Sequence, residues 1–243
     1  MLKQEIALIL LPGMDGTGEL FAPFVQALRA NSKCQNINTI VVCYPPNEIL
    51  SYAQLIKLAS AHIPPNQPYM LLGESFSGPI AIALAEQIDQ ADSQLKGLIL
   101  SCTFARNPRL QLSKLSFIVP TFPIGSFVFS IMCKLMMAKF NNPTIRQRLF
   151  DAVTAVAPKV MRARLDAVIG VDYTEMLRNL NLPILYLQGK SDYLVPPTAG
   201  QYIAEQAKNV ELVELNAPHL LLQIVSNEAV EIVQGFIEKS HQY

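Results

Sequence analysis

Short apolar runs recur along the chain and alternate with longer segments of helical periodicity. Apolar residues fill consecutive positions in these runs, so both faces of each predicted strand are expected to be buried, as in a parallel sheet. Six runs predict strands at Ile6–Leu11, Ile37–Cys43, Tyr69–Leu72, Leu95–Ser101, Ile184–Gln188 and Val210–Leu215. Helices are predicted at Glu19–Ala30, Ser51–Ala61, Phe76–Gln90, Pro197–Lys208 and Ser226–Lys239. The alternation predicts an α/β fold, with a mostly parallel sheet of about six strands and helices on both faces.

One long interval breaks this alternation. Residues 103–178 contain no convincing strand, and Asn142–Arg164 has a helical composition. Leu115–Cys133 is an uncharged stretch of 19 residues, which is long enough to cross a bilayer. It holds two prolines, a glycine and four hydroxyl-bearing residues, which favour a broken helix and loop over an integral membrane span. We therefore expect a core of residues 1–102 and 179–243, with a helical insertion over one edge of the sheet at 103–178.

The composition is that of a globular protein without net charge. Apolar residues make up 51% of the 243 residues and charged ones 16%, which is enough for a substantial core. The 19 basic and 19 acidic side chains balance, and this argues against a general nucleic-acid binder. The four cysteines form no Cys-x-x-Cys motif, and the three histidines are not clustered. We therefore expect reduced thiols in a cytoplasmic protein, with neither a metal site nor another cofactor.

The segment Gly73–Gly78 reads Gly-Glu-Ser-Phe-Ser-Gly and lies where a predicted strand gives way to a helix. A tight turn of this kind lifts the serine hydroxyl above the sheet, and it needs small neighbours because chain segments approach closely there. Ser75 is therefore a candidate nucleophile. The alternative is a helix cap, since serine is favoured at any helix start. Ser77 stands where the motif usually has glycine, which weakens the match.

A serine hydroxyl is a poor nucleophile until a base, usually histidine, takes its proton. His219 directly follows the last predicted strand, whereas the two other histidines lie at a helix end and near the C-terminus. Asp192 is the first acid after the fifth predicted strand, and a carboxylate there could orient the imidazole. The alternatives are a surface histidine with one hydrogen bond and an aspartate that satisfies its own turn.

A glycine-rich loop, Pro12–Gly18, follows the first predicted strand. It lacks both the Gly-Lys-Ser/Thr ending and the Gly-x-Gly-x-x-Gly order of nucleotide sites. The backbone N–H of Met14 could instead face a developing oxyanion, together with the N–H of Phe76. The loop, the serine, the aspartate and the histidine all come at the carboxyl ends of strands, where open parallel sheets place their ligand sites. Because all four features are expected at the same end of the sheet, they favour a single catalytic site.

With these motifs and the order Ser75, Asp192, His219, the sequence resembles the α/β-hydrolase family over essentially its whole length. The resemblance implies the α/β-hydrolase fold, with residues 103–178 as a helical cap. It also implies a carboxylic ester hydrolase that forms an acyl-enzyme on its serine from a small-molecule acyl ester. Pro12 stands where many members have histidine, and the family's first antiparallel hairpin is not evident. An acyltransferase that uses an alcohol and a non-catalytic ligand-binding protein are the alternatives.

The expected cap is rich in aromatic residues and methionines. Ordinary packing against the sheet accounts for most of these side chains. Some could line an acyl pocket, because ligand sites are largely apolar and methionine adapts to varied shapes. The candidates for substrate binding are Phe122, Phe127, Met132 and Met136.

Charge is distributed unevenly along the chain. Ten basic and only two acidic residues lie between Phe104 and Val168. A solvated helical face is one interpretation, and a docking surface for an acidic partner is the other. Acyl carrier protein, a coenzyme A phosphate and an anionic membrane are acidic partners of this kind, and the family resemblance favours the carrier. The docking candidates are Arg146, Arg148, Arg162 and Arg164.

Overall fold

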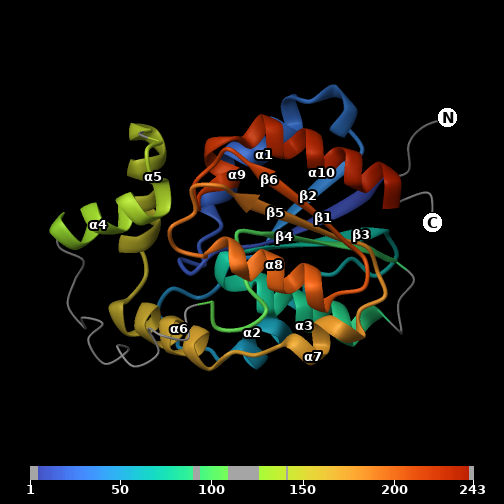
Figure 1. Cartoon of the computed structure of the whole chain (residues 1–243), viewed down its shortest axis with the longest axis horizontal. Coiled ribbons are helices and arrows are strands. Elements are labelled where there is room, and N and C mark those ends of the chain that lie inside the picture. Colours follow the sequence, from blue (N-terminus) through green and yellow to red (C-terminus); the bar gives the residue numbers. More distant parts are fainter. Residues whose placement is uncertain (1–4, 90–93, 109–125, 141, 241–243) are drawn as a thin grey trace.

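The computed structural model has a six-stranded sheet at its centre, in the order β2-β1-β3-β4-β5-β6 (Figure 1). The structure describes residues 5–89, 94–108, 126–140 and 142–240, with residues 89 and 126–128 in their backbone only. The strands are β1 (Ile6–Leu11), β2 (Ile37–Val41), β3 (Tyr69–Glu74), β4 (Leu95–Ser101), β5 (Ile184–Gly189) and β6 (Val210–Leu215). Each strand pairs with its neighbours in parallel, so the predicted fold class is confirmed.

Consecutive apolar positions let the central strands bury both of their faces. In β1, Ala7 and Ile9 belong to one apolar core, whereas Leu8 and Leu10 belong to another on the opposite face. This division follows from the alternation of side chains along a strand. All residues of β1, β3 and β5 are buried. The expected burial of both faces was wrong for β2 and β6, which are partly exposed and lie at the two edges of the sheet, where a strand has a neighbour on one side only.

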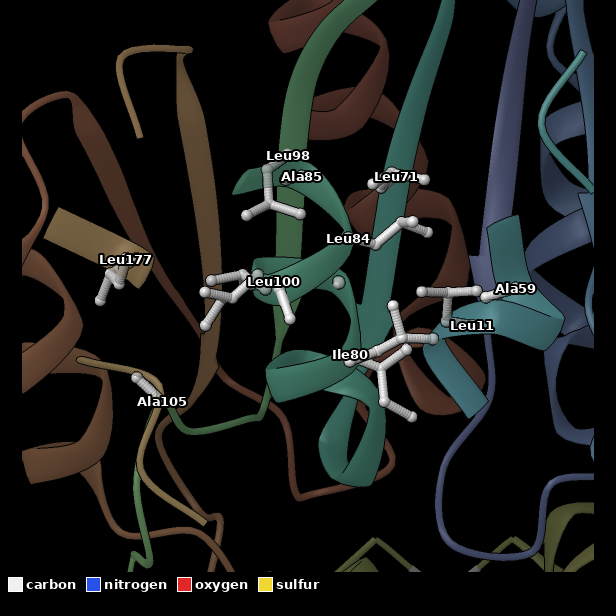
Figure 2. Close-up of a cluster of buried hydrophobic side chains, with 14 of the residues drawn as sticks. Leu11, Ala59, Leu71, Ile80, Leu84, Ala85, Leu98, Leu100, Ala105 and Leu177 are labelled. Carbon is white, nitrogen blue, oxygen red and sulfur yellow. The ribbon is translucent and has the colours of Figure 1, made fainter. Parts of the chain in front are cut away.

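Helices cover both faces of the sheet (Figure 1). On one face lie α1 (Ala22–Ala30), α9 (Leu221–Ile224) and α10 (Ser226–Ser240). On the other lie α2 (Tyr52–Ser60), α3 (Gly78–Asp89), α7 (Thr174–Asn179) and α8 (Pro197–Gln206). In Figure 2, Ile80 and Leu84 of α3 point toward the strands that carry Leu11 and Leu71. The apolar residues of α3 thus hold the helix directly behind β3, the strand that leads into it.

Between β4 and β5, the regular elements that the structure describes are all helices. The helices there are α4 (Ser126–Met137), α5 (Pro143–Thr154), α6 (Pro158–Gly170) and α7. This part of the described chain adds no strand to the sheet, and an isolated bridge joins Arg106 to Asp172. Helices α4 and α5 stand beside one end of the sheet (Figure 1). They form a third apolar cluster with Leu20, which lies in the short 3-10 helix Glu19–Phe21, and with Leu220, which directly precedes α9.

The membrane question raised by Leu115–Cys133 concerns mostly residues outside the described ranges. The structure describes this stretch from Ser126 onward, where it forms the first part of α4. No helix in the described ranges is both long and apolar enough to cross a bilayer.

Candidate active site

Ser75 lies in the sharp turn between β3 and α3. Its backbone has a φ of 49°, a left-handed conformation that is uncommon outside glycine and persists only where the surroundings enforce it. A Cβ on Gly73 would lie 2.8 Å from the Cβ of Ala81, and one on Gly78 would lie 1.9 Å from Thr103 Oγ1. Thr103 also donates a hydrogen bond to the carbonyl oxygen of Ser75. Close contacts therefore require both glycines, and the turn presents Ser75 at the carboxyl end of β3.

Ser77 occupies the motif position that usually holds glycine, and its hydroxyl forms hydrogen bonds with other residues of the protein. The side chain is buried and donates a hydrogen bond to the carbonyl oxygen of Pro12. Tyr44 Oη lies 2.7 Å from Ser77 Oγ and must be the donor of that bond, because the serine proton is already used. Ser77 thus connects the turn after β3 with the loop after β1.

Three side chains from separate loops meet at this turn. His219 Nε2 lies 2.9 Å from Ser75 Oγ, and His219 Nδ1 lies 2.8 Å from Asp192 Oδ2. Asp192 Oδ1 accepts hydrogen bonds from the N–H groups of Leu194 at 2.8 Å and Val195 at 2.9 Å. Imidazole and carboxylate are both buried. An ionised carboxylate only accepts, so Nδ1 bears the imidazole proton and Nε2 is left to accept one from Ser75.

Two buried acids influence the protonation of His219. Burial alone would lower the pKa of His219, but the charge and hydrogen bond of Asp192 and the charge of Glu74 outweigh burial and raise it. Glu74 directly precedes the serine, and its Oε1 accepts a hydrogen bond from Gln223 Nε2 at 2.9 Å. Burial raises the pKa of Glu74 to about 7, against the opposing effects of Gln223 and His219. Glu74 therefore titrates near neutral pH beside the imidazole whose pKa it raises.

A reaction in which His219 takes the proton of Ser75 is expected to accelerate with pH along a limb whose midpoint lies above 6.5, the ordinary pKa of histidine. The sign follows because only neutral imidazole accepts the proton of Ser75, and the pKa of His219 is raised in the folded protein. Glu74→Gln removes a charge that raises this pKa, so the midpoint should move downward. Profiles of kcat/KM between about pH 5 and 9 measure both midpoints. A flat profile, or an unmoved midpoint in Glu74→Gln, would contradict this account.

The loop after β1 borders the same cavity as Ser75. It is held by its own polar groups, since Asp15 Oδ2 accepts hydrogen bonds from the N–H of Thr17 at 2.9 Å and from its hydroxyl at 2.6 Å. Among the described residues, the backbone hydrogen bonds outside helices and strands include none from the N–H groups of Met14 or Phe76. Met14 lies in the wall of the cavity together with Ser75, and the oxyanion role of the Met14 and Phe76 N–H groups stays a prediction.

A cavity of about 350 Å³ lies beside Ser75. Its described wall combines the loop after β1 with residues of α4, α5 and α6, and it is mainly apolar. Met132 and Met136, two of the expected substrate-binding residues, lie in this wall. Phe122 falls outside the described residues, and Phe127 lies on α4 with its side chain outside them. An apolar space thus adjoins the serine hydroxyl.

The four expected docking arginines lie in different environments. Arg146 on α5 is exposed, and Arg148 and Arg162 are half-buried. Arg162 forms an ion pair with Asp166, with a distance of 3.8 Å between Nε and Oδ2. The expectation was wrong for Arg164, which is 3% exposed and donates hydrogen bonds to backbone carbonyls. The distribution of charge along a sequence does not tell a buried arginine from an exposed one. Arg164 is therefore no longer a candidate for docking a partner.

Cys102 brings a third potential metal ligand toward Asp192 and His219. Within the described ranges, the ligand atoms of these three side chains lie within 4.8 Å of one another. Burial raises the pKa of the Cys102 thiol well above its ordinary value. The imidazole and the carboxylate already face each other and Ser75. A metal would have to break this hydrogen-bonded row, so the arrangement fits proton transfer better than metal binding.

Two curated proteins match parts of the sequence, while no protein-family model matches it. Phytyl ester synthase 1, a chloroplastic protein of Arabidopsis thaliana, is 30% identical over 157 residues, which are 58% of this chain and 22% of that protein. A pimeloyl-[acyl-carrier protein] methyl ester esterase of Nitrosospira multiformis is 33% identical over 79 residues, 32% of this chain and 30% of that protein. The chain thus aligns with less than a third of the length of either relative.

Solved structures resemble the chain over nearly its whole length. A lipase-esterase related protein from Clostridium acetobutylicum has a TM-score of 0.78 at 16% identity, covering 96% of this chain and 95% of that one. An enol-lactonase from Burkholderia xenovorans has a TM-score of 0.76 at 16% identity, with coverages of 96% and 92%. A thermophilic esterase from Thermogutta terrifontis has a TM-score of 0.73 at 20% identity, with coverages of 98% and 90%. Together with the parallel sheet and the serine turn after β3, these likenesses show that the chain has the α/β-hydrolase fold.

Proposed function

We propose that the protein is a serine hydrolase that cleaves carboxylic esters through an acyl-enzyme on Ser75. The observation that carries the proposal is the hydrogen-bonded row formed by Ser75, His219 and Asp192. A hydroxyl beside a neutral imidazole that a carboxylate orients is the arrangement that acyl transfer to serine requires. The fold shared with the esterases of known structure supports the same class of reaction.

The reaction has two halves that use the same groups. In the first, His219 Nε2 takes the hydroxyl proton while Ser75 Oγ attacks the carbonyl carbon of the ester. The N–H groups of Met14 and Phe76 stabilise the resulting oxyanion, and one such donor typically contributes about 3–4 kcal/mol. The imidazolium, stabilised by Asp192, then gives its proton to the leaving alcohol. In the second half, the imidazole activates a water that attacks the acyl-enzyme and releases the acid.

Helices α4, α5 and α6 act, in this proposal, as a cap that encloses the acyl group. Its helices contribute Met132, Met136 and Met161 to the wall of the cavity. Ile131 and Leu135 of α4 also line the cavity and are 45% and 39% exposed, so the apolar wall continues to the surface. Among the described residues, no lysine or arginine lines the cavity, and its ionisable groups, Asp15, Glu74 and His219, lie at the end that holds Ser75. These properties fit an uncharged aliphatic group, and a chain-length series of p-nitrophenyl esters measures the preferred length.

A fluorophosphonate probe tests the proposal directly, because the probe reacts with an activated serine. Mass spectrometry of the treated protein should place the label on Ser75, and Ser75→Ala should remain unlabelled. Ser51→Ala, at the N-cap of α2, is a matched control that should label like the wild type. Folded wild-type protein whose Ser75 stays unmodified would refute the assignment.

Acyl groups bound to acyl carrier protein form a narrower substrate class. The matched pimeloyl-[acyl-carrier protein] methyl ester esterase favours this class. So does the position of Arg146, Arg148 and Arg162, which are exposed or half-buried on α5 and α6. An acidic carrier would be attracted to these guanidinium groups and brought toward the cavity that α5 and α6 help to line.

Reversing the charge of Arg146 and Arg148 with glutamate is expected to lower kcat/KM for a carrier-bound ester by about tenfold or more at low salt. Hydrolysis of p-nitrophenyl esters should change little, because these substrates carry no acidic partner. The matched control reverses Arg29 and Lys33, which are exposed on α1 and in the turn after it. Equal losses on both substrates would exclude docking through Arg146 and Arg148.

Transfer of the acyl group to an alcohol is a second candidate function of the same acyl-enzyme. The match to phytyl ester synthase 1 favours it, and so does the apolar cavity, which suits an alkyl alcohol better than water. Incubation with an acyl donor and a long-chain alcohol distinguishes the two outcomes. A new ester of the added alcohol indicates transfer, and free acid alone indicates hydrolysis.

A further inference from the structure

Arg164 of α6 is buried where this helix meets the loop after β1. The residue is 3% exposed, and its Nη1 donates hydrogen bonds to the carbonyl oxygens of Met14 at 2.9 Å and Asp15 at 2.8 Å. Its Nη2 donates to the carbonyl oxygen of Pro45 at 3.0 Å. The three acceptors belong to the loops that follow β1 and β2. One guanidinium group therefore joins α6 to the loop that carries Met14.

The surroundings of Arg164 are shaped for a guanidinium group. A Cβ on Gly16 would lie 2.6 Å from Arg164 Nη1, so the glycine leaves the space that the side chain needs. The ring of Tyr44 lies with its centroid 5.7 Å from Arg164 Cζ, and the same tyrosine bonds Ser77 in the turn after β3. Burial lowers the pKa of Arg164, whereas the charge of Asp15 favours the protonated form. The group therefore acts as a charged donor among backbone carbonyls.

Arginine is the side chain that suits this position. Its planar fork carries five N–H donors in fixed directions, whereas lysine presents a single ammonium group. Two separate nitrogens, Nη1 and Nη2, hold the carbonyls of the two loops, whereas a lysine would have to reach all three carbonyls from one nitrogen. The two loops also meet through the N–H of Tyr44, which bonds the carbonyl of Gly16 at 2.7 Å. Arg164 strengthens this junction from the side of α6.

We propose that Arg164 is a positioning residue for the oxyanion site, and the proposal rests on the hydrolase function proposed above. The N–H of Met14 points at the reacting carbonyl oxygen only while the peptide groups around it keep their orientation. Arg164 fixes the two peptide groups that follow that N–H, while the N–H of Gly16 bonds the carbonyl of Gly13 at 3.0 Å. A displacement of about 1 Å at such a donor can lower a rate about 100-fold.

The steady-state kinetics of Arg164→Met and Arg164→Lys test this role. We expect kcat for a p-nitrophenyl ester to fall about 100-fold in Arg164→Met and about tenfold in Arg164→Lys, with KM within about threefold of the wild type. Lys159→Met, at an exposed position of the same helix, should retain the wild-type kcat. The split between kcat and KM identifies an effect on the transition state, since a loss of ground-state binding would raise KM.

A second readout separates positioning from a general loss of structure. A trifluoromethyl ketone forms an oxyanion on the attacking serine, so its affinity should fall in parallel with kcat/KM across the variants. A ground-state inhibitor, such as the product alcohol, should bind all variants alike. Guanidinium ion at millimolar concentration should restore part of the activity of Arg164→Ala, whereas tetramethylammonium should not.

The possible failures are distinguishable. A wild type that neither hydrolyses esters nor reacts with the fluorophosphonate probe would overturn the proposed function itself. An active wild type combined with a normal kcat in folded Arg164→Met would overturn only the positioning role. If Arg164→Met does not fold, Arg164→Lys decides the matter. A parallel loss of kcat and ketone affinity in that variant supports the role, and an unchanged ketone affinity contradicts it.

Discussion

Replacing Ser75 with alanine is expected to lower kcat for ester hydrolysis by about 10⁶-fold, and replacing His219 with alanine should have a similar effect. Without the hydroxyl no acyl-enzyme forms, and without the imidazole its proton has no acceptor within reach. The two side chains act as one unit through the 2.9 Å contact between Nε2 and Oγ, so the double variant should be no slower than either single variant. Hydrolysis of a p-nitrophenyl ester, measured above the raised pKa of His219, gives these rates.

Asp192→Asn should lower kcat by about 10⁴-fold, because backbone N–H groups fix the orientation of the side-chain amide. Asp192 Oδ1 accepts hydrogen bonds from the N–H groups of Leu194 and Val195. The amide oxygen of asparagine would take the position of Oδ1, because only an oxygen can accept these bonds. The amide NH₂ would then face His219 Nδ1 and donate to it, which leaves the imidazole proton on Nε2, toward Ser75. That tautomer cannot act as the base. An Asp192→Asn variant with nearly normal activity would rule out this role for the carboxylate.

Gly78→Ala is expected to lower the free energy of unfolding by about 3 kcal/mol and the Tm by about 6–12 °C. The added Cβ would lie 1.9 Å from Thr103 Oγ1 and 2.6 Å from its Cγ2, and both residues are packed in the interior. Thr103 cannot move aside without releasing its hydrogen bond to the carbonyl of Ser75. The serine turn should therefore be disturbed as well, with a fall in probe labelling of the folded fraction.

Gly235→Ala is the matched control, because a Cβ there meets nothing within 4 Å on α10. It should be neutral or stabilising by up to about 1 kcal/mol, since alanine favours a helix more than glycine does. In a background with Thr103→Gly, the cost of Gly78→Ala should shrink, and a double-mutant cycle measures this coupling. Equal melting temperatures for Gly78→Ala and the wild type would show that the contact is relieved at little cost.

The elements that the sequence predicted well are those whose signal is local. Apolar runs located all six strands, and the reason is clearest in β1, β3 and β5, which are buried on both faces. Element ends were less accurate where the chain makes contacts beyond the run itself. The run ending at Cys43 continues past β2, which stops at Val41. From there Tyr44 N–H bonds the glycine loop at Gly16, so the chain leaves the sheet before the apolar run is finished.

The sequence predicted those site residues whose position follows from the order of the strands. It did not predict those whose role depends on contact with a side chain far away in the sequence. Ser75, Asp192 and His219 each follow a strand, so a parallel sheet brings them to one edge. Glu74 and Arg164 gave no such signal. Glu74 influences the imidazole only because its carboxyl is buried beside a residue 145 positions later, and Arg164 meets a loop 149 positions earlier. Contacts of that separation leave no trace in composition or periodicity.

The bonds from Arg164 to the loop limit which parts of this protein can be exchanged with a relative. A chimera that replaces everything from α4 to α6 would remove the donor from the carbonyls of Met14 and Asp15, and the buried Asp15 carbonyl left unpaired would cost about 1–3 kcal/mol. A graft that replaces α4 and α5 alone would retain those bonds and still change Met132 and Met136 in the cavity wall. If the proposed function holds, selectivity for the acyl chain can therefore be re-engineered in the first two helices while α6 keeps its bonds to the loop after β1.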